Sequence, residues 1–342
     1  MTCKRLTMWM PASPYIQSEI LFPKLETLEI QRCPQLEKVP CLQLQSVKDL
    51  KLDKVGDTQS LKMEKMKVLP QKLSYFSKLE NLTVRYCENM KSIPNGLMSL
   101  KKLAVQKCPS LACIPDDLSS LNTLEIRVCP LLACIPDGLS SLRELIVIDC
   151  EGLQSLPKSL KECSSLELVC ICECPLIKGP IPDLGRLEGL VKLYLINSGE
   201  LMIPCLQWIP NLHSLWELKI GGFGNTPNLP KLTYPHSLRN LSLQDFPNIK
   251  FLHQQFLPST LHSLEIFRFD ELEQIPEWIG NLSSLQSLTL LHCNKLKCLL
   301  PLKHATLQAL YIADCPLLTE RCAKDGGYEW PHISHIPNIH IS

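Results

Sequence analysis

Apolar and variable positions follow one fixed phrase along nearly the whole chain, Leu-x-x-Leu-x-Leu-x-x-Cys-x-x-Leu-x-x-Ile-Pro. The Leu-x-Leu part alternates apolar and variable side chains, which is typical of a short β-strand with one buried face. Three neighbouring copies, which begin at Leu79, Leu100 and Leu121, follow one another at intervals of 21 residues. The pattern therefore predicts a chain built from repeated units that each contain one strand.

Aligned on its first apolar residue, the phrase divides the chain into thirteen units. A period of about 20 to 29 residues with this leucine spacing is the signature of a leucine-rich repeat solenoid. A longer step of 32 residues, from Val47 to Leu79, predicts an insertion at Gly56 to Lys65, and such insertions form loops. The repeats begin at Leu25, Val47, Leu79, Leu100, Leu121, Leu142, Leu166, Leu190, Leu215, Leu238, Leu261, Leu285 and Leu307.

One such strand is not stable alone, but strands stacked side by side merge their inward leucines into a continuous core. Period two sends Leu145 and Val147 inward, and Ile146 and Ile148 outward. The return segments are rich in Pro, Ser and Gly, which predicts turns and single helical turns instead of full helices. We therefore expect an α/β solenoid, a leucine-rich repeat horseshoe with one curved parallel β-sheet on its concave face and mostly loops or short helical turns on its convex face.

The domain organisation predicted from this pattern is a single solenoid, because no change of composition separates one half of the 342 residues from the other. Residues 1–20 hold no full copy of the phrase, and we expect a degenerate first repeat or an N-terminal edge there. The solenoid itself is assigned to residues 21–315, and a C-terminal closing segment to residues 316–342.

The charge balance gives no sign of a nucleic-acid or membrane partner. Lys and Arg number 35 against 34 Asp and Glu, a formal net charge of +1, so no overall attraction for nucleic acid or anionic membranes is expected. No uncharged apolar run reaches the roughly 18 residues of a membrane span. The first 20 residues also lack a continuous apolar stretch of signal-peptide length, so we expect a cytoplasmic protein.

The 18 cysteines are placed by the repeat instead of in pairs. Eight occupy the slot just after the strand, where a small buried side chain fills the bend, and Cys113 and Cys134 share a second slot before Ile-Pro. Cysteines at equivalent positions form a ladder of small buried hydrophobes, so we expect reduced thiols, in agreement with a cytosolic location. The eight slot cysteines are Cys33, Cys87, Cys108, Cys129, Cys150, Cys174, Cys293 and Cys315.

Sequence motifs for chemistry are lacking. The chain contains no phosphate-binding glycine loop, dinucleotide fingerprint, zinc-protease motif or serine-hydrolase elbow. Cys170 and Cys172 should project from one sheet face about 7 Å apart, but a closed zinc site needs four ligands, which favours a chance pair of thiols. His332, His335 and His340 of the closing segment have no partner positioned by the pattern. We predict a chain that is not an enzyme, with no catalytic residue, no metal site and no cofactor.

The predicted working surface is the set of variable positions on the exposed, concave side of the sheet. Each repeat contributes about five of them in register with its neighbours, and aromatic residues and Arg are favoured at the centres of protein interfaces. We therefore predict a protein-binding face, in which Arg85, Lys107, Arg127 and Arg143 form a stripe for an oppositely charged partner. The full set is Arg85, Tyr86, Lys101, Lys107, Arg127, Arg143, Tyr194, Trp216, Phe267, Arg268, His292 and Tyr311.

The phrase and the tail of the chain resemble one family of repeat proteins. The copies LETLEIQRCPQLEKVP, LNTLEIRVCPLLACIP and LQALYIADCPLLTERC are similar to the repeat region of plant intracellular nucleotide-binding leucine-rich repeat disease resistance proteins, particularly the coiled-coil type. The tail CPLLTERCAKDGGYEWPHISHIPNIHI is similar to the ending of these immune receptors, and the resemblance covers about residues 21–342. The signalling module and nucleotide-binding switch that precede the repeats in the family have no counterpart motifs in this chain.

The resemblance implies a protein-recognition and autoinhibitory domain of a plant innate immune receptor. In the family, the repeats hold the nucleotide-binding switch inactive and recognise a pathogen effector or a guarded host protein. We expect this chain to bind such proteins and to bind no nucleotide itself.

Two other classes of protein use similar repeats. The first is a substrate adaptor of a ubiquitin ligase, for which no F-box-like helical segment precedes the repeats. The second is an enzyme, a ligase that bears repeats beside a catalytic domain. Residues 316–342 are too few for an independent catalytic domain, so the recognition role is the preferred interpretation.

Overall fold

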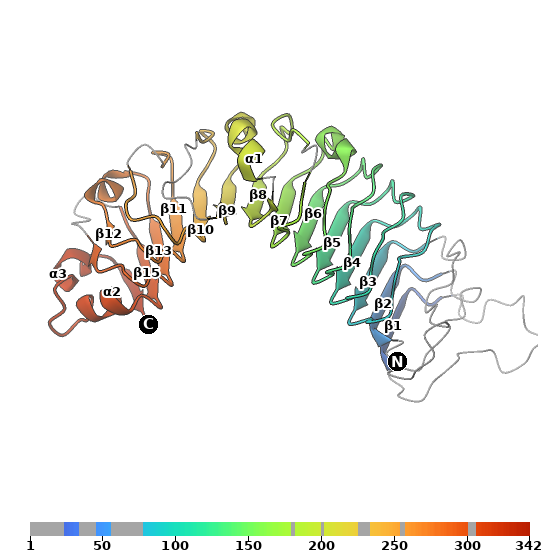
Figure 1. Cartoon of the computed structure of the whole chain (residues 1–342), viewed down its shortest axis with the longest axis horizontal. Helices are drawn as coiled ribbons and strands as arrows, with labels where there is room; N and C mark the ends of the chain where they lie inside the picture. The colour runs from blue at the N-terminus through green and yellow to red at the C-terminus, as the bar shows by residue number, and fades with distance from the viewer. Residues whose placement is uncertain are drawn as a thin grey trace, which may run out of the picture. The chain divides into compact units, whose positions relative to one another are not determined.

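The structure is a computed structural model in which the chain divides into two compact units, Met1–Pro182 and Asp183–Ser342 (Figure 1). The described part of each unit consists of the repeat that the phrase predicts. The predicted edge at residues 1–20 and the predicted insertion at Gly56 to Lys65 lie outside the described residues. The structure describes residues 24–33, 46–55, 78–178, 182–199, 202–224, 233–253, 257–299 and 306–342.

In its described part, the first unit is a parallel sheet of seven strands, one from each of the first seven repeats (Figure 1). The chain runs from one strand to the next through a return segment, as parallel pairing requires. The 3-10 turn η2 (Lys158–Glu162) is one such segment. The strands are β1 (Thr27–Cys33), β2 (Asp49–Val55), β3 (Asn81–Arg85), β4 (Lys102–Gln106), β5 (Thr123–Arg127), β6 (Glu144–Ile148) and β7 (Leu168–Cys172).

The core of this unit lies along the inward face of the sheet. Leu145 on β6 is paired with Leu124 on β5 and Val169 on β7, and all three side chains are fully buried. Ile146 and Ile148, the alternate residues of β6, are half-buried on the opposite face. The inward and outward faces predicted from period two are therefore confirmed.

The residue before the slot of each repeat has a left-handed backbone conformation, which the phrase alone did not predict. Twelve described residues other than glycine have φ between 47° and 57°, and each directly precedes the slot residue. The backbone N–H at this bend still pairs with the next repeat, as from Tyr86 to the carbonyl of Gln106 at 2.9 Å. The twelve are Arg32, Lys54, Tyr86, Lys107, Val128, Asp149, Glu173, Asn197, Asp245, Arg268, His292 and Asp314.

Cysteine suits the slot after this bend because it is small and can donate a hydrogen bond. All eight slot cysteines are buried, and each S–H donates to the carbonyl two residues earlier, as from Cys129 to Arg127 at 3.5 Å. Ser198 fills the same slot and makes the same bond at 3.1 Å. Burial raises the pKa of Cys174 to about 12, so this thiol stays protonated and acts as a small hydrophobe. The predicted buried slot is confirmed.

The second unit also contains seven parallel strands in its described part, of which six belong to predicted repeats. Every one of the thirteen predicted repeats therefore has its strand. The return segments hold short helical turns, as predicted: α1 (Met202–Trp208), η4 (Ile209–Asn211) and η6 (Glu277–Asn281), together with a two-stranded parallel sheet of β12 (Gln274–Ile275) and β14 (Cys298–Leu299). The strands of the main sheet are β8 (Lys192–Ile196), β9 (Glu217–Gly221), β10 (Asn240–Gln244), β11 (Ser263–Phe267), β13 (Ser287–Leu291), β15 (Ala309–Ala313) and β16 (Asn338–Ile341).

The closing segment adds one strand that the repeat phrase did not predict. After α2 (Pro316–Arg321) and α3 (Trp330–Ile333), β16 pairs in parallel with β15, so that Ile339 lies opposite Leu310. Glu329, which is 2% exposed, accepts hydrogen bonds from the N–H of Leu299 and from Arg321, both at 3.2 Å. The segment thus covers the edge of the last repeat, which would otherwise present unpaired backbone groups.

Candidate protein-recognition surface

The outward face of each sheet, which we call the exposed sheet face, has two edges with different chemistry. The strand-start edge is formed by the residue before each strand, such as Lys101 before β4. The strand-exit edge is formed by the last strand residue and the left-handed residue after it, such as Arg85 and Tyr86 at the end of β3. All twelve candidate residues are exposed or half-buried, and the two edges separate them into groups.

Basic side chains gather on the strand-exit edge of the first unit. Each of the first five repeats places one there, and repeats follow one another at about 4.8 Å, so the charges form a line. Glu125 partly neutralises the line, because its carboxylate lies 2.7 Å from Nε of Arg127, and Asp53 of β2 is a second acid beside it. We call this line the cationic strip; it consists of Arg32, Lys54, Arg85, Lys107 and Arg127.

Tyr86 lies inside the cationic strip with its ring between two ammonium groups. The ring centroid is 5.2 Å from Nζ of Lys54 and 5.0 Å from Nζ of Lys107. Lys54 belongs to the preceding repeat and Lys107 to the following one, and Nζ of Lys107 also donates a hydrogen bond to the Tyr86 hydroxyl at 3.4 Å. Each cation–π contact contributes about 0.5–1 kcal/mol at an exposed site, which fixes the position of the charges. Lys54 is not among the predicted site residues, although it stands at the same place in the phrase as Tyr86 and Lys107.

The predicted stripe of four basic residues is wrong in one member, Arg143. The register places Arg127 opposite Ile148, whereas Arg143 stands five residues before Ile148, about 16 Å away along an extended strand. Arg143 therefore lies on the strand-start edge, where it forms an ion pair with Glu167. Lys101 lies on the same edge and is paired with Glu80 at 3.0 Å. The four residues were predicted to form a stripe because they lie in successive repeats, but Arg143 occupies an earlier position within its repeat than the other three.

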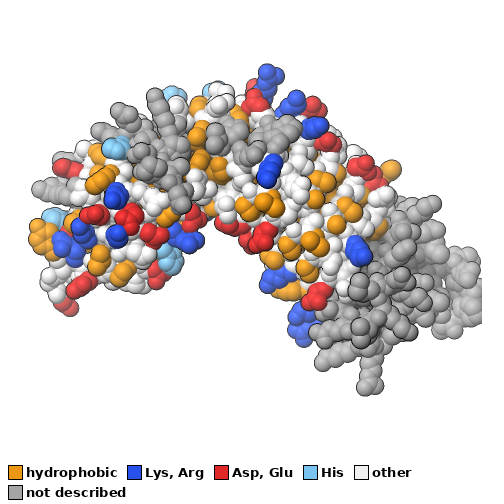
Figure 2. Space-filling view, in the orientation of Figure 1, with side chains coloured by type: hydrophobic (Ala, Val, Ile, Leu, Met, Phe, Trp, Pro, Cys, Tyr) orange, Lys and Arg blue, Asp and Glu red, His pale blue; other side chains and the backbone are white. Residues whose placement is uncertain are grey.

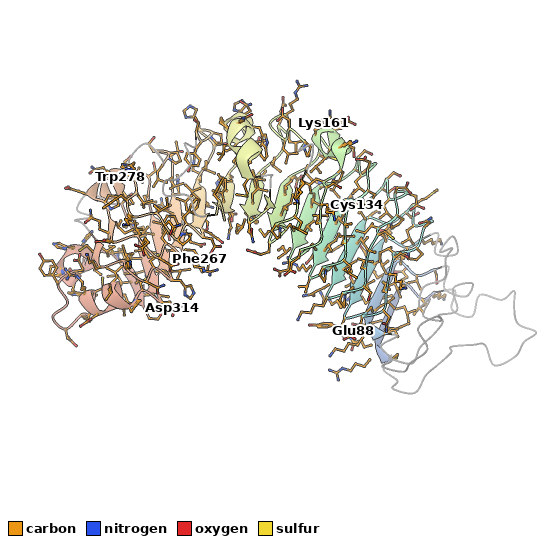
Figure 3. All side chains as sticks on the ribbon, in the orientation of Figure 1. Glu88, Cys134, Lys161, Phe267, Trp278 and Asp314 are labelled. Carbon is orange, nitrogen blue, oxygen red and sulfur yellow. The ribbon has the colours of Figure 1, made fainter. Side chains whose placement is uncertain are left out.

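A second cluster forms on the strand-exit edge of the second unit, where the structure brings three predicted residues together. The rings of Phe267 and His292 meet edge to face with centroids 5.2 Å apart, and Arg268 lies 6.0 Å from the Phe267 centroid. Asp245 is 3.1 Å from Arg268, and Asp314 is 3.4 Å from His292. Figure 3 shows Phe267 and Asp314 on the same side of this unit. Unlike the cationic strip, this cluster sets two carboxylates beside its basic side chains.

The three remaining aromatic candidates lie apart from that cluster. Tyr311 of β15 is 44% exposed, and its ring lies 6.3 Å from the ring of His340 on β16. Tyr194 of β8 is half-buried beneath Nζ of Lys219 at 5.3 Å. Trp216 is 45% exposed on the strand-start edge of β9. The contact between Tyr311 and His340 could not be predicted from the repeat, because β16 is not a copy of the phrase.

Side chains suited to chemistry remain few in the described residues. Sγ of Cys170 and Sγ of Cys172 are 3.7 Å apart, closer than the spacing along a strand predicts, because the two side chains lean together. His332 lies 3.5 Å from the buried carboxylate of Glu329, and this pair belongs to the closing segment. Across the ranges that the structure describes, no group of three or more His, Cys, Asp or Glu is arranged to hold a metal ion. In those ranges no helix has both the length and the apolar character to cross a bilayer.

Comparison with solved structures identifies the fold, whereas comparison of sequences finds no match. No family model and no curated protein matches the sequence. Among solved structures, the chain is similar to TLR13 in its complex with ssRNA13, with a TM-score of 0.54 and 18% sequence identity over 93% of this chain and 54% of that one. The chain has the leucine-rich repeat fold.

Two further solved structures are similar at lower scores. One is a leucine-rich repeat protein of Leptospira interrogans, with a TM-score of 0.46 and 19% identity over 92% of this chain and 89% of that protein. The other is CroV588, a circular leucine-rich repeat protein, with a TM-score of 0.43 and 14% identity over 85% of this chain and 50% of that one. This leucine-rich repeat chain spans about half the length of TLR13.

Proposed function

We propose that this chain is a protein-recognition module whose binding surface is the exposed sheet face of its repeats. The cationic strip carries the proposal, since five basic side chains from five successive repeats form one line that an acidic protein surface fits. Complementary charge of this kind gives a partner its orientation and speeds its association. Repeat solenoids offer such extended, regular surfaces to their partners.

An acidic protein suits the strip better than single-stranded nucleic acid. Single strands bind by stacking their bases on open aromatic faces, and Tyr86, the one aromatic side chain along the strip, is half-buried with Nζ of Lys54 and Nζ of Lys107 at 5.2 and 5.0 Å from its ring centroid. The near-neutral balance of the chain, +1, also favours a local charged contact over a general attraction for phosphate. The strip therefore offers charge together with a single half-buried ring, which is little surface for stacked bases.

The partner class follows from the resemblance of the phrase and the tail to plant immune receptors. We infer that the chain serves as the recognition and autoinhibitory region of a receptor of this kind in the cytoplasm. Its partners are then a pathogen effector, a guarded host protein or the nucleotide-binding switch of the receptor. Nucleotide binding belongs to the switch, and this chain supplies recognition.

Reversing the charge of the cationic strip tests the recognition proposal. We expect the triple variant Lys54→Glu, Arg85→Glu and Lys107→Glu to retain at least about tenfold less partner protein from leaf extract than the wild-type chain, because each attraction becomes a repulsion. The immobilised chains are compared by quantitative mass spectrometry of the retained proteins.

A matched control carries the same change of charge on the strand-start edge. Lys101→Glu, Lys102→Glu and Arg143→Glu lie at or just before the first residues of β4 and β6, and the exposed ion pairs of Lys101 and Arg143 contribute about 0–1 kcal/mol each, so this variant should retain the same partners as wild type. If the two triple variants retained equal amounts of partner protein, the cationic strip would not be part of the recognition surface. Unchanged far-ultraviolet spectra show that both variants are folded.

A further inference from the structure

Repeats five to seven carry an exposed apolar patch at the strand-exit edge, next to the cationic strip. Leu131 is 61% exposed, Leu176 is 45% exposed and Val128 is 37% exposed, while Ile148 between them is half-buried. We call these four residues the apolar exit patch. Figure 2 shows hydrophobic side chains gathered on the visible face of the first unit. Large side chains at these exposures are candidates for contact with another molecule.

The middle of the apolar exit patch has no side chain. Leu131, Gly152 and Leu176 each stand two residues after a slot cysteine, so they occupy the same position in three successive repeats. A Cβ on Gly152 would lie 2.1 Å from the carbonyl oxygen of Pro130, and only glycine fits there. The two leucines are two repeats apart, about 10 Å, and they flank a position that is bare backbone.

Val128 is a residue type that suits this left-handed bend poorly. Val128 has φ of 57°, and it is the one β-branched residue among the twelve described non-glycine residues of positive φ. A β-branched side chain is strained in this conformation, which Asn and Asp adopt more readily. Because Val128 is 37% exposed, its burial within the chain does not offset the strain. Strain of this kind is characteristic of functional sites.

Acidic residues are interleaved with the apolar exit patch. Asp149 and Glu151 are exposed and Glu173 is half-buried, and all three lie within two residues of a slot cysteine in repeats six and seven. The sequence contains no Lys or Arg between Arg143 and Lys158. The surface is therefore apolar and negative, the reverse of the cationic strip beside it. An occupant needs apolar side chains at a spacing of about 10 Å together with positive charge.

We propose that the apolar exit patch binds a basic amphipathic helix of a partner protein. Residues i and i+7 of a helix are about 10.5 Å apart, which matches the distance between Leu131 and Leu176, and the residue at i+3 or i+4 then faces the bare position at Gly152. Lysines or arginines that flank this apolar stripe meet Asp149 and Glu151. This inference deepens the recognition role proposed above, and it uses residues outside the cationic strip.

A model peptide provides the probe. An 18-residue amphipathic helix of Leu and Lys, labelled with fluorescein, is titrated with the full chain and followed by fluorescence anisotropy. We expect saturable binding to the wild-type chain and at least about tenfold weaker binding to Leu131→Ser with Leu176→Ser, because both apolar anchors are lost. Leu317→Ser is the matched control, since Leu317 is also 45% exposed and stands two residues after slot Cys315 in the second unit; it should bind within about twofold of wild type.

Val128→Asn separates a binding role from a structural one. The substitution relieves backbone strain, so the melting temperature should rise by about 2–4 °C, while peptide binding weakens at least about threefold. A merely structural residue would not combine a gain of stability with a loss of binding. If binding were unchanged at the higher melting temperature, Val128 would have no part in the site and the strain argument would fail.

The outcomes that overturn the inference differ from those that overturn the recognition role. Absence of saturable binding, equal affinity for a peptide of Leu and Glu, or full binding by Leu131→Ser with Leu176→Ser would each refute the helix site. None of these results affects capture of an acidic partner by the cationic strip. Loss of that capture, conversely, leaves the affinity for the Leu and Lys peptide unchanged.

Discussion

Replacement of Leu145 by aspartate is expected to unfold the repeats on both sides of it. The side chain is fully buried between Leu124 and Val169 of the neighbouring strands. The change removes apolar contact and places an unpaired carboxylate in the core, so we expect a loss of more than about 4 kcal/mol in the free energy of unfolding. Because each repeat is stabilised by its neighbours, the damage should spread to adjacent units. Urea denaturation followed by circular dichroism measures the loss.

Glu144→Ala is the control for this prediction, one residue earlier on the outward face. Glu144 is half-buried and accepts a hydrogen bond from Thr123 at 3.2 Å. Its loss should change the free energy of unfolding by about 0.5 kcal/mol or less, as is usual for surface substitutions. Similar denaturation midpoints for the two variants would show that the faces of the strand are assigned incorrectly.

Replacement of Glu329 by alanine is expected to release the closing segment and to cost about 1–3 kcal/mol, because a buried backbone donor loses its acceptor while Arg321, 37% exposed, keeps contact with water. The carboxylate is 2% exposed, lies 3.2 Å from Arg321 and accepts the N–H of Leu299. Its removal leaves a partly buried guanidinium without its partner and a backbone donor unsatisfied. Hydrogen–deuterium exchange should then accelerate across residues 316–342 before the other repeats are affected.

Two further variants separate the buried pair from a general effect of charge. Asp325→Ala removes an exposed acid of the same segment and should change stability by about 0.5 kcal/mol or less. Glu329→Leu combined with Arg321→Met removes both charges and should recover the part of the loss that comes from the unpaired guanidinium, while the N–H of Leu299 stays unsatisfied. If Glu329→Ala exchanged like wild type across residues 316–342, the buried carboxylate would not hold the segment in place.

The strands and the core could be predicted from the sequence because the same pattern of apolar and variable positions occurs in every repeat. A strand buried on one face must alternate at period two, and stacking aligns the alternation of each repeat with the next. Leu145 and Ile146 were therefore assigned to opposite faces correctly from their place in the phrase. The cysteine slot was recognised for the same reason, although the hydrogen bond from Cys129 to Arg127 needed coordinates.

The bend after each strand escaped prediction because its residues share no composition. Left-handed conformations are usually marked by Gly or Asn, but here they occur at Val128, Tyr86 and several charged residues. The geometry is imposed by the slot that follows, which must point inward. The type of residue at this position therefore does not predict its backbone conformation. The extra strand β16 escaped for a related reason, since it follows two short helices and carries no copy of the phrase.

The candidate surface was predicted in composition but not in arrangement. Arg85, Lys107 and Arg127 do lie in one line, whereas Arg143 stands at the other end of its strand. Pairing of Lys101 with Glu80 likewise depends on which residues of adjacent repeats stand side by side. These contacts are set by the register between repeats. Residues at the same position of the phrase lie side by side in adjacent repeats, so the contacts can be predicted only if each position is compared from one repeat to the next.

Hydrogen–deuterium exchange of the chain bound to the partner retained in the capture experiment tests the central claim most directly. If the strand-exit edge of the first unit is the recognition surface, exchange should slow at residues 85–87, 106–108 and 127–129, the ends of β3, β4 and β5. The strand-start residues 99–101 and 120–122 should exchange as in the unbound chain. Slowing confined to the return segments, such as residues 112–118, or to the closing segment, with no change at the strand exits, would contradict the account.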